Sequence, residues 1–228
     1  MYIFHAGMTE ISKRIHHIQQ ALPQGVTLLA VSKHHTPENI LQAYNAGLRD
    51  FGENYVQELH AKQAQLPKAI QWHFIGHLQR NKVKQILPYV YLIHSLDRKE
   101  LAHEIEKQAA LIGKIQPVLL QLHVASETSK FGFSEDEFQA FIHSDITTRY
   151  PHLKILGLMA MASFTNETAI LEQEFKRAKK AYMQLSALFP HAHVLSMGMS
   201  SDYKLAISHG STMVRMGTAI FGDRKPTK

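Results

Sequence analysis

The sequence contains no cysteine among its 228 residues and only one tryptophan. Without cysteine, the chain has no disulfide framework, no thiol nucleophile and no cysteine-ligated metal site. It also lacks any apolar run near the roughly 20 residues that a membrane helix needs. The segment Met1–Ala21 lacks the apolar core and small-residue cleavage site of a signal peptide. These absences are typical of a cytoplasmic protein, and we expect no membrane partner.

Acidic residues are outnumbered by basic ones, 19 to 25, which leaves a formal net charge of +6. Such a charge attracts phosphate-bearing ligands or nucleic acid. The basic residues are scattered along the chain, however, and the cluster at 176–180 lies on one predicted helix, as on an ordinary solvent-exposed face. We therefore expect no nucleic-acid partner.

Several motifs that would indicate other chemistries are missing. No G-x-G-x-x-G or P-loop follows the first predicted strand, so nothing specific favours an open doubly wound sheet that binds nucleotides. No H-E-x-x-H motif appears among the sixteen histidines. His73 and His77 are four residues apart, but they fall on a strand and its following loop rather than on one helical face. We expect no metal site.

Apolar strand-like runs alternate with amphipathic helical segments along the whole chain. A helix that starts near Met8 and ends near Leu22 comes first, because its apolar residues recur every three or four positions. Eight predicted strands follow: Thr27–Val31, Leu48–Phe51, Gln71–Ile75, Val90–His94, Pro117–Val124, Ile155–Met161, His193–Met197 and Met213–Met216. Eight strand–helix units predict an α/β fold, a single (β/α)8 TIM barrel with an extra N-terminal helix. We expect one domain over residues 1–228, with 224–228 as a tail.

Local signals mark the ends of several predicted helices. Pro37 follows Thr36 at the first position of one helix, and Gly113 stands where a left-handed C-terminal cap belongs. The spacings Asp97-x-x-Glu100 and Ser134-x-x-Glu137 predict two capping boxes.

Lys33 is the most informative residue. It ends the apolar run Leu28–Ser32, and a lysine at the end of a buried strand is costly unless it has a partner or a function. Partial burial lowers the pKa of an ammonium group, and the free amine can attack an aldehyde to form a Schiff base. Chemistry in such barrels gathers at the carboxyl ends of the strands, where Lys33 would lie.

The seventh and eighth predicted strands end at the place where such barrels often bind phosphate. Ser200 or Ser201 could donate a hydroxyl to a phosphate oxygen, or could simply cap the following helix. Gly217 and Thr218 could add backbone N–H donors. Arg215 could donate to a pyridine nitrogen, or could form a structural salt bridge. A phosphate and an aldehyde on one ligand indicate pyridoxal 5′-phosphate.

Longer motifs then suggest a family, because the chain resembles the pyridoxal phosphate homeostasis proteins, whose fold is similar to the alanine racemase N-terminal barrel domain. The matching stretches are Ala30–Lys33, Phe51–Glu58, Trp72–Lys82, Gly157–Met161, Ser196–Asp202 and Gly210–Gly222. The resemblance implies that the cofactor is bound as a Schiff base on Lys33, that Arg215 faces the pyridine nitrogen, and that Asn54 lies near the cofactor. It further implies that Ser200, Gly217 and Thr218 hold the phosphate. His77 departs from the proline that is common there, a change that should not disturb binding.

The same resemblance implies intracellular buffering or delivery of the cofactor, with effects on amino-acid metabolism and without robust turnover. The alternatives are a weakly active racemase or related enzyme with this cofactor, and a cofactor-free Schiff-base aldolase, for which the sixth predicted strand lacks the usual lysine. Racemisation requires bases on both faces of the cofactor. In alanine racemases a second domain supplies a tyrosine for this purpose, and this chain ends soon after the last motif. Tyr55 and Tyr203 are conceivable substitutes within the barrel. We expect a cofactor carrier.

Two further expectations concern partners and a second cation. Apo enzymes that depend on pyridoxal 5′-phosphate are the expected recipients of the cofactor, and we expect a monomer. Lys130, in the loop after the fifth predicted strand, is a candidate second cation near the cofactor, with a minor electrostatic role.

Overall fold

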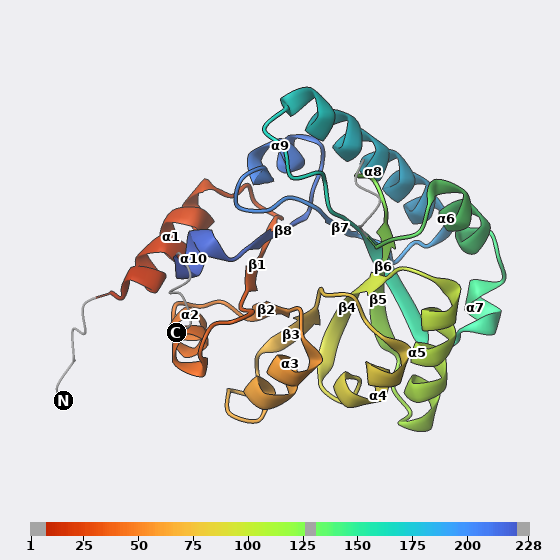
Figure 1. Cartoon of the computed structure of the whole chain (residues 1–228), viewed down its shortest axis with the longest axis horizontal. Helices are drawn as coiled ribbons and strands as arrows, with labels where there is room; N and C mark the ends of the chain where they lie inside the picture. Colours follow the sequence, from red (N-terminus) through yellow and green to blue (C-terminus); the bar gives the residue numbers. More distant parts are fainter. Residues whose placement is uncertain (1–7, 126–130, 223–228) are drawn as a thin grey trace.

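Eight parallel strands close into a barrel in the computed structural model, which describes residues 8–125 and 131–222. Each strand pairs with its neighbour in sequence, and β8 pairs with β1, where Leu29 lies opposite Arg215. Helices surround this barrel, as Figure 1 shows. The closed barrel confirms the predicted (β/α)8 architecture over the open sheet.

The elements alternate along the chain as the periodicity predicts. The strands are β1 (Thr27–Val31), β2 (Asp50–Glu53), β3 (Gln71–Phe74), β4 (Val90–Leu96), β5 (Gln116–Leu122), β6 (Leu153–Ala160), β7 (Val194–Ser196) and β8 (Met213–Met216). The helices are α1 (Glu10–Ala21), α2 (Pro37–Asn45), α3 (Val56–Gln63), η1 (Arg80–Lys82), α4 (Val83–Ile86), α5 (Lys99–Leu111), α6 (Glu135–Ile142), α7 (Ile146–Arg149), α8 (Thr168–Leu188), α9 (Tyr203–Ser208) and α10 (Thr218–Phe221).

The bounds of β1 and β8 match the prediction, whereas β2 lies two residues later than predicted. β2 ends in Gly52 and Glu53, and both are buried. Neither residue type is typical of a strand interior, so the apolar pattern placed the strand too early. The tertiary structure compensates by giving the Glu53 carboxylate partners, which are described below.

Helix ends follow the local signals in all but one case. Ser134 and Glu137 form the predicted capping box, Pro37 is the first residue of α2, and Gly113 has a φ of 62° after α5. The capping box predicted at Asp97 is wrong, because α5 begins one residue later, with Arg98 as its N-cap.

The Asp97 carboxylate is buried and binds other groups instead of the helix backbone. It accepts hydrogen bonds from Arg98 Nη1 and from His77 Nδ1, the latter at 3.0 Å. Two strong side-chain donors therefore outcompete the N–H groups of the first turn of α5.

The extra N-terminal helix is present as α1. Ile11, Ile15 and Ile18 form its buried face, and α1 contacts α2 and α10. The Thr9 hydroxyl accepts a hydrogen bond from Ser12 N–H at 3.2 Å, which satisfies one of the unpaired donors of the first turn. α1 therefore covers the barrel beside the junction of β1 and β8 (Figure 1).

Apolar side chains form two clusters, one between the barrel and its helices and a smaller one inside the barrel. The inner cluster consists of Leu29, Leu92, Leu119, Leu156, Met159, Val194 and Met213. Barrel interiors are normally packed with such residues. Here several buried polar residues share the interior, which matters for the site. Across residues 8–125 and 131–222, no helix has the length and apolar character needed to cross a bilayer.

Lys114 offers a test of the packing between α5 and β4. Its Nζ donates to the carbonyl oxygens of Leu87 and Val90 at 2.7 Å each, and burial lowers its pKa to about 8. A neutral amine keeps two N–H donors, so deprotonation preserves both bonds. Because the folded pKa lies below that of the unfolded chain, the folded state binds fewer protons between pH 8 and 10.5. The free energy of unfolding should therefore rise with pH in this range relative to Lys114→Met.

Chemical denaturation at pH 8, 9 and 10 measures this difference. The matched control is Lys107→Met, which alters an exposed lysine on α5 and should give a curve parallel to that of the unaltered protein. Parallel curves for Lys114→Met would contradict the prediction.

Candidate functional site

A pocket of about 480 Å³ opens at the carboxyl ends of the strands, the end of the barrel where the sequence predicts the site. All six predicted site residues line it: Lys33, Asn54, Ser200, Arg215, Gly217 and Thr218. They come from the loops after β1, β2 and β7, from β8 itself and from the start of α10. The volume lies within the range of small-molecule sites. The structure brings the residues together, and their individual roles stay predictions.

Lys33 follows β1 by two residues, in a turn whose backbone is unusual. The next residue, His34, has a φ of 65°. This angle lies in the left-handed region of backbone conformation, which residues other than glycine rarely occupy. A backbone conformation of this kind persists only when contacts with the surrounding structure stabilise it. Such contacts are present at both neighbours of Lys33, Ser32 and His34.

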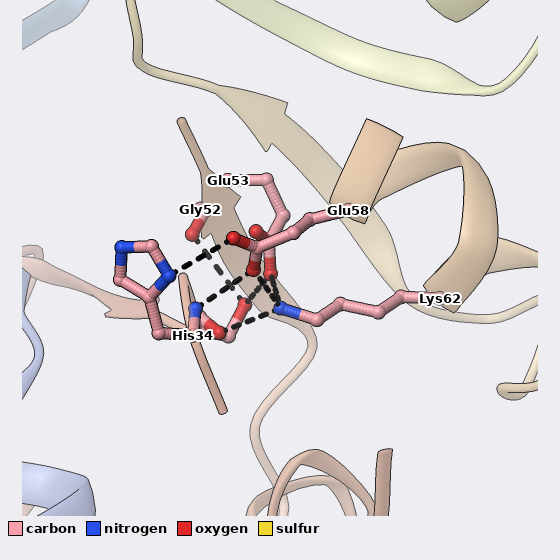
Figure 2. A network of polar contacts seen from close by, with 6 residues as sticks. His34, Gly52, Glu53, Glu58 and Lys62 are labelled. Carbon is pink, nitrogen blue, oxygen red and sulfur yellow. Dashed lines mark hydrogen bonds and ion pairs between the residues drawn. The ribbon is translucent and has the colours of Figure 1, made fainter. Parts of the chain in front are cut away.

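A network of polar and charged groups, with a buried centre at Glu53 and Lys62, flanks the Lys33 turn (Figure 2). Lys62 Nζ donates to the Ser32 carbonyl at 2.9 Å, to Glu53 Oε1 at 2.8 Å and to Glu58 Oε2 at 2.7 Å. The backbone N–H of His34 donates to Glu58 Oε2 at 2.7 Å, and the Ser32 hydroxyl donates to Glu53 Oε1 at 2.6 Å. Both neighbours of Lys33 are therefore anchored to α3 and to the end of β2. We refer to Ser32, His34, Glu53, Glu58 and Lys62 as the turn network.

The two carboxylates of the turn network have opposite pKa shifts. Burial raises the pKa of Glu53 and outweighs the opposing effect of Lys62. Burial also acts to raise the pKa of Glu58, but the hydrogen bonds from Lys62 and from His34 N–H overcome it, so this pKa is lowered. The lowered pKa favours the ionised form of Glu58. For Glu53, burial opposes ionisation, and the nearby Lys62 ammonium favours it.

Arg215 is buried in β8 and is held by the barrel itself. Its Nη1 donates to the carbonyl and hydroxyl oxygens of Ser196 at 2.8 Å each, and its Nη2 donates to the Ala160 carbonyl at 2.9 Å. The salt bridge that the sequence left open as an alternative is not among the ion pairs of the described residues. These bonds use three of the five N–H groups of the guanidinium, and the other two have no hydrogen-bond partner among the described residues. Burial lowers the pKa of Arg215 to about 10, which keeps it protonated at neutral pH.

Asn54 carries an unsatisfied polar atom. Its Oδ1 is buried and has no hydrogen-bond partner within the part of the chain that the structure describes. The residue is positioned by a close approach of two backbones, because a Cβ on Gly76 would lie only 2.1 Å from the Asn54 carbonyl oxygen. Asn54 therefore lines the pocket with an amide whose oxygen is enclosed by the protein.

Ser200 and Ser201 line the pocket and do not cap a helix. The N-cap of α9 is Asp202, and the Asp202 carboxylate accepts a hydrogen bond from Met199 N–H. The alternative that the serines are ordinary helix caps is therefore wrong, because Asp202 binds the loop backbone and the helix begins after it.

The charges of the pocket suit an anion. Lys33 and Arg215 line it, and no carboxylate is among its lining residues in the described chain. Three hydroxyls, from Ser200, Ser201 and Thr218, add neutral donors. One amine, one guanidinium and several hydroxyls match a ligand that carries both a carbonyl group and a phosphate.

Other residues of the site were not singled out from the sequence. The pocket is also lined by Val31, His35, Ile75, Met161, Phe164, Met199 and Gly222. Within the turn network, Lys62 was missed, although Glu58 and Lys62 are four residues apart on a predicted helix, a spacing that indicates an ion pair. Lys130 lies outside the described residues. Within the described ranges no cluster of three or more metal-binding side chains occurs.

Comparisons with known proteins agree with this geometry. The family model described as alanine racemase, N-terminal domain, matches residues 8–225. A pyridoxal phosphate homeostasis protein of Pasteurella multocida is 41% identical over 232 residues, which cover 97% of this chain and 98% of its relative. A protein of the same name from Aquifex aeolicus is 40% identical over 203 residues, 87% of each chain.

Solved structures of related proteins have the same barrel fold. PipY of Synechococcus elongatus, in a structure with pyridoxal phosphate bound, is 35% identical, has a TM-score of 0.85, and the match covers 93% of this chain and 100% of PipY. Alanine racemase of Streptomyces coelicolor shares the fold, with a TM-score of 0.80 at 15% identity, and the match covers 94% of this chain but 58% of the racemase. The chain therefore belongs to the family of pyridoxal phosphate homeostasis proteins, whose barrel is that of the alanine racemase N-terminal domain.

Proposed function

We propose that this protein binds pyridoxal 5′-phosphate in the pocket at the carboxyl ends of the strands and takes part in intracellular homeostasis of this cofactor. The observation that carries the proposal is that one amine, Lys33, and one guanidinium, Arg215, line the same pocket with several hydroxyls and without a carboxylate from the described residues. The names of its relatives and the PipY structure with pyridoxal phosphate support it.

Each of the six predicted residues has a role in this proposal. Lys33 Nζ holds the cofactor as a Schiff base, and Arg215 donates a hydrogen bond to the pyridine nitrogen. The phosphate is held by the remaining donors, Ser200, Gly217 and Thr218, which follow β7 and β8. Asn54 lies beside the cofactor. The two N–H groups of Arg215 that have no partner among the described residues support this fit, because each is a donor that an acceptor atom of the ligand could satisfy.

The cofactor supplies an aldehyde that can exchange between amines, and the residues around it favour storage over catalysis. Arg215 stays protonated and can only donate, so it keeps the pyridine nitrogen unprotonated. A ring without a proton on this nitrogen is a poor electron sink. We infer a carrier that acts as a monomer in the cytoplasm and releases the cofactor to apo enzymes that depend on it. We also infer that the whole chain forms one domain.

A comparison of two vitamers tests the proposal. The purified protein is titrated with pyridoxal 5′-phosphate and with pyridoxal, and binding is followed by absorbance. We expect the phosphorylated form to bind at least about tenfold more tightly, because even one charge-assisted hydrogen bond to phosphate contributes that much. Borohydride reduction followed by peptide mapping should place the adduct on Lys33.

Two results would contradict the proposal: equal affinity for the two vitamers, or an adduct spread over surface lysines. Incubation of the loaded protein with L-alanine or L-serine separates the carrier from the enzyme. We expect neither the D-isomer nor the keto acid to accumulate, and robust accumulation of either would favour the racemase alternative.

A further inference from the structure

A chain of polar side chains crosses the interior of the barrel below the pocket. His73 in β3, His94 in β4 and Ser196 in β7 have no exposed surface, and they connect Asp50 in β2 to Arg215 in β8. The contacts are Asp50 Oδ1–His73 Nε2 at 3.0 Å, His73 Nδ1–His94 Nε2 at 2.8 Å, His94 Nδ1–Ser196 Oγ at 3.4 Å and Ser196 Oγ–Arg215 Nη1 at 2.8 Å. We refer to these five residues as the interior chain.

The direction of every hydrogen bond in the interior chain follows from its Arg215 end. Arginine can only donate, so Ser196 Oγ accepts from it. The buried Ser196 hydroxyl must then place its own proton on an acceptor, because a buried donor without a partner is costly. Its partner among the described residues is His94 Nδ1, which must therefore carry no proton.

The same reasoning continues to the other end. Burial places the pKa of His94 well below its usual value, so the ring is neutral and carries its proton on Nε2. His94 Nε2–H then donates to His73 Nδ1, and His73 Nε2–H donates to Asp50. A carboxylate can only accept, so the far end agrees with this direction. Every member is satisfied in one arrangement, with both imidazoles in the Nε2–H form.

The two ends of the interior chain lie at opposite openings of the barrel. Arg215 lines the pocket at the carboxyl ends of the strands. Asp50 and His73 line a separate cavity of about 290 Å³, whose wall includes the first residues of β1, β3, β7 and β8. The interior chain therefore spans the barrel from its floor to the pocket.

We propose that Asp50, His73, His94 and Ser196 are positioning residues for Arg215, because their one directional chain of hydrogen bonds ends on Arg215 Nη1 and adds to the bonds from Arg215 to the Ser196 and Ala160 carbonyls. The arrangement fixes the guanidinium although no carboxylate in the pocket is hydrogen-bonded to it among the described residues. A carboxylate there would repel an anionic ligand and would occupy the N–H donors that the ligand needs. The Asp202 charge also stabilises Arg215, but none of the ion pairs or hydrogen bonds of the described residues joins the two. The inference rests on the proposed function only for the identity of the ligand.

NMR of the unaltered protein without cofactor tests the direction of the chain. Long-range ¹H–¹⁵N spectra at neutral pH distinguish the two imidazole tautomers, and His73→Gln and His94→Gln assign the signals. We expect both histidines as single Nε2–H tautomers. A proton on His94 Nδ1, or a doubly protonated His94, would overturn the proposal.

Asp50→Ala then tests whether the floor of the barrel acts on the pocket. Removal of the terminal acceptor should shift the signals of His94 and of Arg215 Nε–H, although neither residue is hydrogen-bonded to Asp50. It should also weaken pyridoxal 5′-phosphate binding by about two- to tenfold, which is typical of coupling through a network.

The matched control is His193→Asn, because His193 lines the same floor cavity outside the interior chain. We expect this variant to leave the His94 and Arg215 signals and the affinity unchanged. Unchanged His94 and Arg215 signals in Asp50→Ala would overturn the proposal. Since the NMR measurements contain no cofactor, their failure would leave the proposed function intact, and a failure of cofactor binding would leave the interior chain intact.

Discussion

Replacement of Lys33 by alanine should abolish the covalent chromophore that forms when the protein is mixed with pyridoxal 5′-phosphate. Lys33 is the lysine among the described lining residues of the pocket, and formation of a Schiff base requires an amine. The turn network holds the backbone on both sides of position 33 through Ser32 and His34, so removal of this side chain should leave the pocket folded. The loss should therefore be one of chemistry rather than of structure.

The measurement is the absorbance spectrum before and after borohydride reduction, followed by mass analysis of the adduct. Lys68→Ala is the matched control, because Lys68 is exposed and is not among the residues that line the pocket, and we expect it to behave like the unaltered protein. The residues proposed to donate hydrogen bonds to the phosphate remain in Lys33→Ala. Pyridoxal 5′-phosphate should therefore still raise the melting temperature of this variant reversibly, but by less than in the unaltered protein. The same reducible chromophore in Lys33→Ala would refute the assignment.

Lys62→Met should destabilise the fold by about 3–5 kcal/mol at neutral pH, since it removes one partner of a buried ion pair. Glu53 is fully buried, and its second oxygen, Oε2, already lacks a hydrogen-bond partner in the described residues. Without Lys62, the Glu53 carboxylate would keep the Ser32 hydroxyl as its remaining donor. The deficit should appear as a lower midpoint of denaturation at an unchanged m-value.

The pH dependence of this deficit distinguishes the buried charge from a simple loss of packing. In the variant, burial raises the pKa of Glu53 without opposition from Lys62. A group whose pKa is raised by folding stabilises the folded state at low pH and loses that contribution as pH rises through the folded value. The deficit of Lys62→Met should therefore shrink toward pH 4.5 and grow toward neutral pH.

Lys62→Met combined with Glu53→Gln provides the control for the buried charge. The double variant carries no buried ion at this position, so it should recover much of the lost stability and show little pH dependence of the deficit. A deficit of the same size at pH 4.5 and pH 7, or a double variant no better than the single one, would contradict the role given to Glu53.

The same substitution links the turn network to the site. Lys62 binds the Ser32 carbonyl and holds Glu58, which in turn binds the N–H of His34. Its loss should loosen the turn and weaken binding of the cofactor at Lys33. This contribution was not found from the sequence, where the spacing of Glu58 and Lys62 indicates only a helical ion pair.

Strand β2 shows where sequence reasoning reached its limit within the fold. Apolar patterning identified the strand but placed it too early, because Glu53 is buried at its end. A glutamate is compatible with that position only when a donor such as Lys62, nine residues later, faces it. Asp97 failed as a predicted helix cap for a related reason, since its carboxylate binds His77 at a distance of twenty residues along the chain.

The sequence by itself determined the order of strands and helices, the closed barrel with its additional first helix, and the six residues that meet in the pocket. The elements and the barrel follow from periodicity, helix-end signals and strand order, and most of the six residues follow from the rule that chemistry gathers at the carboxyl ends of parallel strands. The resemblance to a known family added Asn54 and the choice of Ser200 over Ser201. Only the tertiary structure decided the partners of the buried charges. Ser196 and His94 meet across 102 residues, and no local pattern specifies a contact that exists only once the barrel has closed.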